Sequence, residues 1–274
     1  MASSKNILSA NTGMRRSLGR RATFHMKTKN SNLLTGFDEL TKPWRHGSRP
    51  DLGTMPLETM YKCIEANFSP SRPNNLSRQN WRFTKELYIE IRNLSREKGL
   101  EKSISLFSGD KWANQVPTAS GFCRSEDRGR RLDLVYESTD STFVFYELKV
   151  TPASGDFIHA AIELLGYGLL YVFSRSLPAY KECRLMKAKT VHLRVLGTWD
   201  YYEQQINRRR IGPTKEHEEG LSVNVNQFAS NRLPGFNMDF GFDTFLRNFS
   251  WSVEDRKNKE KVLAALDGIH PLFS

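Results

Sequence analysis

The sequence predicts an α/β fold with a mixed central sheet flanked by helices. Three stretches carry this prediction: a strand pair from Arg131 to Val150, an apolar helix that begins at Phe157, and a strand from Thr190 to Trp199. Strand patterns that alternate with helical patterns are typical of α/β domains. The chain has 274 residues, of which 38% are hydrophobic, so it is long and apolar enough to bury a sizeable core.

The strand pair is a predicted hairpin. Its side chains alternate with a period of two on both sides of the polar segment Ser138 to Thr142. With that segment as the loop, Glu137 faces Phe143. Counting back along both strands then places Asp133 directly opposite Glu147, and opposite residues on one face have Cβ atoms about 4.5–5.5 Å apart.

Lys149 adds a cation to these two acids. It lies two residues beyond Glu147 and therefore points to the same face of the sheet. Like charges opposite one another destabilise a sheet, so the pair of acids needs a compensating cation: Lys149, or a divalent metal. Mg²⁺ or Mn²⁺ could be held by Asp133, Glu147 and the backbone carbonyl of Leu148. Lys149 would then orient or deprotonate a water, or stabilise charge in the transition state, as metal-dependent cleavage of a phosphodiester requires.

This motif resembles that of a known family. Asp133, followed by Glu147-Leu148-Lys149 at the end of the next strand and then by a helix, resembles the PD-(D/E)XK nuclease superfamily, which includes restriction endonucleases. The resemblance covers about Phe83 to Trp199 and implies a restriction-endonuclease-like αβββαβ core. It also implies a Mg²⁺-dependent nuclease, with DNA favoured over RNA because most of the superfamily acts on DNA. The proline that precedes the aspartate in the family is Leu132 here.

The helix after the hairpin supplies two further candidates, Glu163 and Tyr167. Ser154 and Asp156 can cap this helix, and its apolar residues on nearly all sides predict burial against a sheet. Glu163 and Tyr167 are spaced i,i+4 and share a face. RecB-like members of the superfamily carry Gln-x-x-x-Tyr on the equivalent helix, near the metal. Glutamate in place of glutamine leaves three roles open for Glu163: a bond to Lys149, contact with a metal-bound water, or neither.

A third carboxylate is expected from an amphipathic helix upstream, over Arg82 to Lys98. Its apolar stripe consists of Phe83, Leu87, Ile91 and Leu94. Glu90 falls inside this stripe, where a carboxylate is costly unless it is paired or bound to metal. We therefore take Glu90 as a candidate metal ligand and Glu86 as the second choice. The alternative for Glu90 is a boundary glutamate that reaches solvent.

The remaining elements are read from periodicity and turn residues. Apolar residues at helical spacing from Leu57 to Phe68 predict a helix at the start of the body. Trp112 to Phe122 is expected to supply the first strand. Alternation over Leu221 to Phe228 predicts an edge strand, and Trp251 to Leu266 is expected to form a C-terminal helix.

Residues 1–50 are predicted to form a basic arm on a single nuclease-like domain, residues 51–274. Seven Lys and Arg and no acid occur within residues 1–37, which accounts for most of the net charge of +11. The arm fits contact with nucleic acid, an organellar transit peptide or a solvated tail, and we favour nucleic acid. Arg208 to Arg210 form a second candidate phosphate contact, with an ordinary exposed basic loop as the alternative.

The amino-acid composition limits the cellular compartments and the partners to be considered. Cys63, Cys123 and Cys183 are isolated, which indicates free thiols in a reducing intracellular compartment, with the cytoplasm favoured. No apolar run approaches the roughly 18 residues of a membrane span. Related nucleases often dimerise, although nothing in the sequence marks a dimer face. Two other functions stay open: a nucleic-acid-binding protein that keeps the fold without cleavage, and a structural or interaction protein in which the hairpin is incidental.

Overall fold

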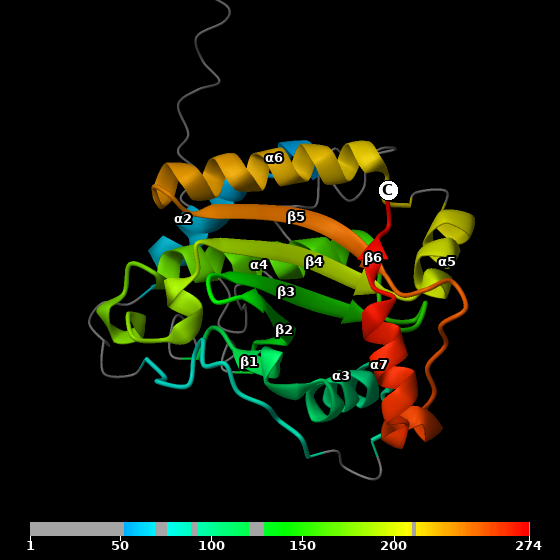
Figure 1. Ribbon diagram of the computed structural model, residues 1–274. Helices are drawn as coiled ribbons and strands as arrows, with labels where there is room; N and C mark the ends of the chain where they lie inside the picture. Colours follow the sequence, from blue (N-terminus) through cyan, green and yellow to red (C-terminus); the bar gives the residue numbers. More distant parts are fainter. Residues whose placement is uncertain (1–51, 69–75, 89–92, 121–128, 210–211, 274) are drawn as a thin grey trace, which may run out of the picture.

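The computed structural model describes residues 52–68, 76–88, 93–120, 129–209 and 212–273. At its centre is a mixed six-stranded sheet with the strand order β1-β2-β3-β4-β5-β6 (Figure 1). The strands are β1 (Trp112–Pro117), β2 (Arg131–Thr139), β3 (Thr142–Lys149), β4 (Thr190–Gly197), β5 (Asn237–Thr244) and β6 (His270–Pro271). Strands β1 to β3 are antiparallel neighbours, β3 to β5 run parallel, and β6 is antiparallel to β5.

Helices flank this sheet, so the predicted α/β class with a mixed central sheet is confirmed. The helices are α2 (Leu57–Asn67), α3 (Arg96–Phe107), α4 (Phe157–Ser174), α5 (Trp199–Arg209), α6 (Lys215–Arg232) and α7 (Lys259–Asp267). Short 3-10 turns are η1 (Leu52–Thr54), η3 (Gly109–Lys111), η5 (Pro178–Tyr180), η6 (Arg184–Lys187) and η7 (Val253–Lys257). Figure 1 shows α4 behind the sheet, α6 along β5, and α3 and α7 together in front.

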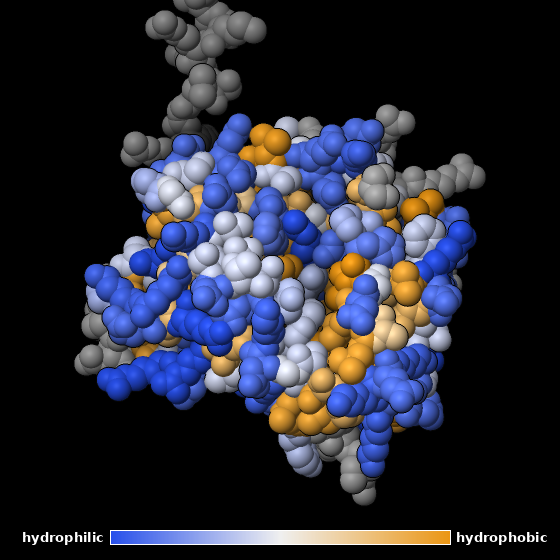
Figure 2. Space-filling view, in the orientation of Figure 1, coloured by the Kyte–Doolittle hydropathy of each residue, from blue (hydrophilic) through white to orange (hydrophobic). Residues whose placement is uncertain are grey.

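The sheet separates two hydrophobic cores. On the α4 side, Phe143, Phe145 and Leu193 are fully buried. On the other side, Leu134 and Leu148 belong to a smaller core with residues of α3 and α7. Because side chains alternate along a strand, the neighbours of Leu148 on β3 point to the α4 side. In Figure 2 the face seen in Figure 1 is largely hydrophilic, and its apolar residues gather where the smaller core reaches the surface.

The close packing of helix α4 inside the protein accounts for its apolar sequence. It begins at the predicted cap, where Asp156 accepts a hydrogen bond from the backbone N–H of His159 at 2.7 Å. A Cβ on Gly168 would lie 2.7 Å from Leu193 Cδ1, so the glycine allows the helix to approach β4 closely. Contrary to expectation, α4 is long and apolar enough to cross a membrane. However, 89% of it is buried inside the protein, so packing accounts for its composition.

The β2–β3 hairpin has the predicted register. Glu137 pairs with Phe143, as counted from the sequence. The loop is nevertheless shorter than Ser138 to Thr142, because the strands reach Thr139 and Thr142 around a tight turn. A β-bulge between Glu137 and Thr139 takes up the extra residue, so the register survives the wrong loop length.

The predicted helix over Arg82 to Lys98 is wrong. Residues 82–88 and 93–95 have no regular structure, and α3 begins only at Arg96. Leu87 and Leu94, which were assigned to its apolar stripe, are 44% and 76% exposed. The true start is set by Ser95, whose side chain accepts a hydrogen bond from the backbone N–H of Lys98 at 3.2 Å. The helical spacing upstream of this cap was coincidental.

The predicted edge strand over Leu221 to Phe228 is also wrong, because this segment lies inside α6. Leu221, Val225 and Phe228 are buried on one face of the helix, and their spacing of four and three residues fits a helical period. Thr214 caps the helix by accepting a hydrogen bond from the backbone N–H of His217 at 3.3 Å. A short run of alternating apolar residues fits both periods, and the cap decides between them.

The other expected elements are present with different bounds. The helix that begins at Leu57 ends at Asn67, the first strand ends at Pro117, and the C-terminal helix is delayed to Lys259 by a cap at Asn258. Strand β5 was not predicted. The expected arm, residues 1–50, lies outside the described residues.

Candidate active site

The adjoining ends of β2 and β3 bring two acids together. The ladder pairs Leu134 with Tyr146, so its next step places Asp133 opposite Glu147. The carboxylate of Asp133 accepts a hydrogen bond from the backbone N–H of Leu148 at 2.9 Å and so reaches across to β3. Glu147 is buried and Asp133 is half-buried. Two carboxylates therefore lie together at one end of the hairpin.

Lys149 lies beside these acids. Its Nζ donates a hydrogen bond to Glu147 Oε1 at 2.7 Å, and the two side chains are 9% and 6% exposed. A buried ion pair is strongly coupled, because removing one partner leaves an uncompensated charge away from water. The structure thus brings Asp133, Glu147 and Lys149 together where β2 and β3 adjoin.

Burial and repulsion from nearby carboxylates raise the pKa values of both acids. Burial raises the pKa of Asp133 to about 6, and the negative charges of Glu163 and Glu97 add to burial against the opposing effect of Lys149. Burial, followed by the charge of Asp133, raises the pKa of Glu147 well above its ordinary value. Ionisation of both acids would place more negative charge at this end of the hairpin than Lys149 alone neutralises.

Lys149 itself is held in the charged form. Burial lowers its pKa, but the carboxylates of Glu147 and Asp133 raise the pKa by more, so the net pKa lies above the ordinary value. A lysine that acts as a general base would instead need a pKa below its ordinary value. Of the roles considered from the sequence, this environment favours orientation of a water or stabilisation of negative charge by the ammonium group.

Helix α4 places Glu163 and Tyr167 next to the hairpin acids. Tyr167 Oη donates a hydrogen bond to Glu163 Oε1 at 3.3 Å, across the predicted i,i+4 spacing. Burial, then the charges of Glu163, Glu147 and Asp133, raise the pKa of Tyr167 well above its ordinary value. Lys149 hydrogen-bonds to Glu147 rather than to Glu163. Glu163 and Tyr167 therefore border the two hairpin acids, and Glu163 does not hydrogen-bond to Lys149.

Helix α3 supplies two acids that were missed in the sequence. Glu97 Oε1 accepts a hydrogen bond from the backbone N–H of Val150, directly after β3, at 3.2 Å. Glu101 lies one turn later and is only 2% exposed. Burial, then the charge of Asp133, raise the pKa of Glu101 to about 8. The sequence did carry a signal: Glu97 and Glu101 are spaced i,i+4, directly after the Ser95 cap.

Gln115 holds Glu101 from a strained backbone position. Its Nε2 donates to Glu101 Oε2 at 2.9 Å, while Asn114 Nδ2 donates to Glu101 Oε1 at 2.7 Å. Gln115 has a φ of 51°, in the left-handed region, which costs a non-glycine residue about 1–3 kcal/mol. The pairing of its neighbours with β2 puts Gln115 opposite Asp133. The strain thus falls at the acid cluster, and strained residues are concentrated at functional sites.

The carboxylates proposed upstream are not part of this cluster as described. Glu90 lies outside the described residues. Glu86 is exposed and forms ion pairs with Lys102 at 3.2 Å and Arg131 at 2.8 Å. Glu97 and Glu101 are therefore the acids that the region before β1 contributes within the described residues.

The donor chemistry of the cluster fits a hard divalent cation. Carboxylate oxygens with excess negative charge are what Mg²⁺ prefers, and Asp133, Glu147 and the carbonyl of Leu148 would hold the ion. In the described part of the chain, no three His, Cys, Asp or Glu side chains are arranged as ligands of one ion. Lys149 binds one oxygen of Glu147, so an ion there would require Glu147 to share its carboxylate.

The basic run at Arg208 to Arg210 begins at the end of a helix rather than in the exposed loop considered as the alternative. Its first two residues end helix α5, because the segment after Trp199 is helical. The side chains of Arg208 and Arg209 lie outside the described parts, as does all of Arg210. Contact of this run with phosphate therefore stays a prediction.

Comparisons with known families, curated proteins and solved structures give no match for this chain. The resemblance to PD-(D/E)XK nucleases is carried by the motif from Asp133 to Lys149. The case for a function rests on that motif and on the geometry of the side chains around it.

Proposed function

We propose that this chain is a metal-dependent nuclease with a restriction-endonuclease-like core. The observation that carries the proposal is the meeting of Asp133, Glu147 and Lys149 at the end of the hairpin, with Lys149 bound to Glu147 at 2.7 Å. The element order α3-β1-β2-β3-α4-β4 supports an αβββαβ core. The net charge of +11 supports a polyanionic substrate, and DNA is favoured over RNA.

The side chains of the proposed site have different roles in phosphodiester hydrolysis. A bound Mg²⁺ or Mn²⁺ would supply Lewis-acid polarisation of a phosphoryl oxygen. Asp133 and Glu147 would hold that ion through their carboxylates. Lys149, which keeps its proton, orients the attacking water or stabilises the negative charge that develops on phosphorus and its oxygens. Glu163 and Tyr167 border the same space from α4.

The raised pKa values of Asp133, Glu147 and Glu101 support a cation site. Each acid is harder to ionise here than in water, because burial and repulsion both oppose its charge. A structural role alone does not explain this cost, since a neutral side chain of similar size would avoid it. Clusters of this kind are typical of functional sites.

Cleavage assays test the proposal. The purified chain is incubated with single-stranded, duplex and branched DNA, and with RNA, in Mg²⁺, Mn²⁺ or EDTA. We expect cleavage that requires metal and falls by about 10²–10³ in Lys149→Ala, the cost of removing an electrostatic stabiliser. The control Lys62→Ala, on the exposed side of α2, should cut normally. Cleavage that persists in EDTA or in Lys149→Ala would contradict the proposal.

A nucleic-acid-binding protein that does not cleave is the second candidate. It is favoured by the ion pair that engages Glu147 and by the absence, within the described residues, of three side chains arranged around one ion. The same assays separate the two functions. Binding without cleavage in any metal supports this second candidate, and no binding at all supports a structural or interaction protein.

A further inference from the structure

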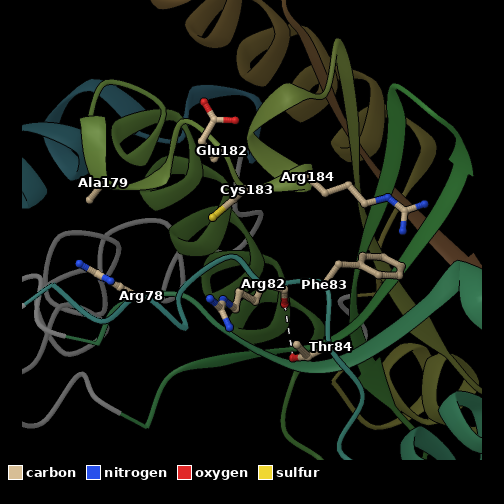
Figure 3. A pocket seen from close by; sticks show the side chains of 8 residues that line it. All are labelled: Arg78, Arg82, Phe83, Thr84, Ala179, Glu182, Cys183 and Arg184. Carbon is tan, nitrogen blue, oxygen red and sulfur yellow. Dashed lines mark hydrogen bonds between the residues drawn. The ribbon is translucent and has the colours of Figure 1, made fainter.

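A cavity lined by arginines lies toward the opposite end of the hairpin from the acids. A cavity of about 420 Å³ opens between residues 78–84, which precede β1, and the turns η5 and η6, which follow α4 (Figure 3). Three of its lining residues are arginines: Arg78, Arg82 and Arg184. Its one acid, Glu182, points away from them in Figure 3, is highly exposed and pairs with Lys187 at 3.2 Å.

Arg184 is fixed in place by two contacts. Its guanidinium forms an ion pair with Glu137, which is only 4% exposed. The guanidinium also lies over the ring of Phe83, 5.0 Å from the ring centre. Phe83 is in turn packed edge-on against Phe143, with ring centroids 6.1 Å apart. A guanidinium held in this way loses little freedom when it binds an anion.

Arg78 and Arg82 supply charge that no acid neutralises among the residues that the structure describes. Both side chains are exposed, and among the described residues neither forms an ion pair. Figure 3 shows them on the side of the cavity opposite the carboxylate of Glu182. Three arginines thus line the cavity, and of these only Arg184, whose guanidinium extends toward Phe83 in Figure 3, is paired within the described residues. Arginines gathered in this way are suited to phosphate, whose oxygens accept their hydrogen bonds in pairs.

We propose that this cavity binds a phosphate group, carried either by the backbone of a nucleic acid or by a free nucleotide. Its volume fits a phosphate with an attached sugar, within the roughly 300–1,000 Å³ of small-ligand pockets. Glu137, which holds Arg184, lies four residues along β2 from Asp133, or about 14 Å. The site is therefore separate from the acid cluster, and binding there requires neither metal nor cleavage.

Binding in EDTA tests this inference independently of any nuclease activity. The full chain is titrated with labelled single-stranded and duplex DNA at several salt concentrations, and separately with inorganic tripolyphosphate. The double variant Arg78→Glu/Arg82→Glu is compared with Lys62→Glu/Lys259→Glu, which changes the charge equally at exposed sites on α2 and α7. Thermal unfolding verifies that both variants fold.

The expected result is a loss of affinity in the arginine variant that the lysine variant does not show. For duplex DNA, loss of two phosphate contacts lowers the log–log salt slope by about 1.8 and the affinity by at least about tenfold. Loss of DNA binding identifies a nucleic-acid backbone, and loss of tripolyphosphate binding alone identifies a free phosphate ligand. Equal effects of the two variants on both probes overturn the inference, as does failure of the natural chain to bind either probe.

Discussion

The two ends of the β2–β3 hairpin differ in how well their buried acids are paired with cations. At one end Asp133 and Glu147 lie beside Lys149, Glu101 from α3 interacts with Asp133, and all three acids carry raised pKa values. At the other end the buried Glu137 has its own arginine, and the additional charge there is positive. Folding alone would favour the second arrangement, in which each buried charge is paired. The difference supports the proposed cation site, in which the acids would serve ligand binding rather than stability.

Removing Lys149 from the acidic end should have the largest effect on the free energy of unfolding. Lys149→Met leaves the buried Glu147 and the half-buried Asp133 without this counter-charge, so we expect a loss of about 3 kcal/mol in the free energy of unfolding at mildly alkaline pH. Denaturant titration measures this loss, with Lys62→Met on the exposed face of α2 as the control. An equal change in both variants would show that the ion pair does not support the fold.

The acidic end should also make stability depend on pH in an unusual direction. The pKa of Asp133 is raised from 3.8 to about 6 and that of Glu101 from 4.5 to about 8, so between these values the folded chain holds protons that the unfolded chain has released. Unfolding then becomes easier as pH rises from about 4 to about 8, by a few kcal/mol. Melting curves across this range in EDTA measure the slope.

Mg²⁺ should reduce this loss of stability with rising pH, because a bound cation favours the ionised form of the acids. The ion should raise the melting temperature most at the alkaline end of the range. An identical pH slope with Mg²⁺ and with EDTA would argue against a cation site at these carboxylates.

Neutralising one acid at each end of the hairpin should change the free energy of unfolding in opposite directions. In metal-free buffer at mildly alkaline pH, Asp133→Asn removes repulsion and should stabilise the chain by about 1–2 kcal/mol. Glu137→Gln breaks the pair with Arg184 and should destabilise it by about 1 kcal/mol. Denaturant titration of both variants in one buffer makes the comparison. Changes of the same sign would remove the contrast between the two ends.

The smallest effect is expected at Gln115. Gln115→Gly relieves the left-handed backbone, a gain of about 1 kcal/mol, but loses the hydrogen bond to Glu101, a loss of similar size. Stability should therefore change little, while cleavage should slow because Glu101 is released from its position beside Asp133. Melting temperature and cleavage rate are measured on the same preparation. A large loss of stability with unchanged cleavage would assign Gln115 a purely structural role.

The sequence predicted those parts of the fold in which one pattern dominates. The hairpin register followed from period-two alternation, and α4 followed from the Asp156 cap and a continuous apolar run. Strand β5 was missed, although Met238, Phe240 and Phe242 alternate and are buried. Segment 221–228 fitted two periods at once, and the longer range of α6 was needed to choose between them.

The site was predicted where it depends on local pairing and missed where it depends on tertiary contacts. Asp133, Glu147 and Lys149 follow from the strand register. Glu101 is buried only because α3 packs against β1, where Gln115 adopts a left-handed conformation that no sequence pattern signals. The arginine cavity likewise joins segments about 100 residues apart.

The most direct test of the central claim is metal-dependent cleavage of duplex DNA by the natural chain beside Asp133→Asn, purified in the same way. The proposed site predicts cleavage in Mg²⁺ or Mn²⁺ that EDTA abolishes and that falls by about 10²–10³ in the variant, even though the variant is the more stable protein in metal-free buffer. Equal cleavage by the two proteins, or cleavage by neither, would contradict it.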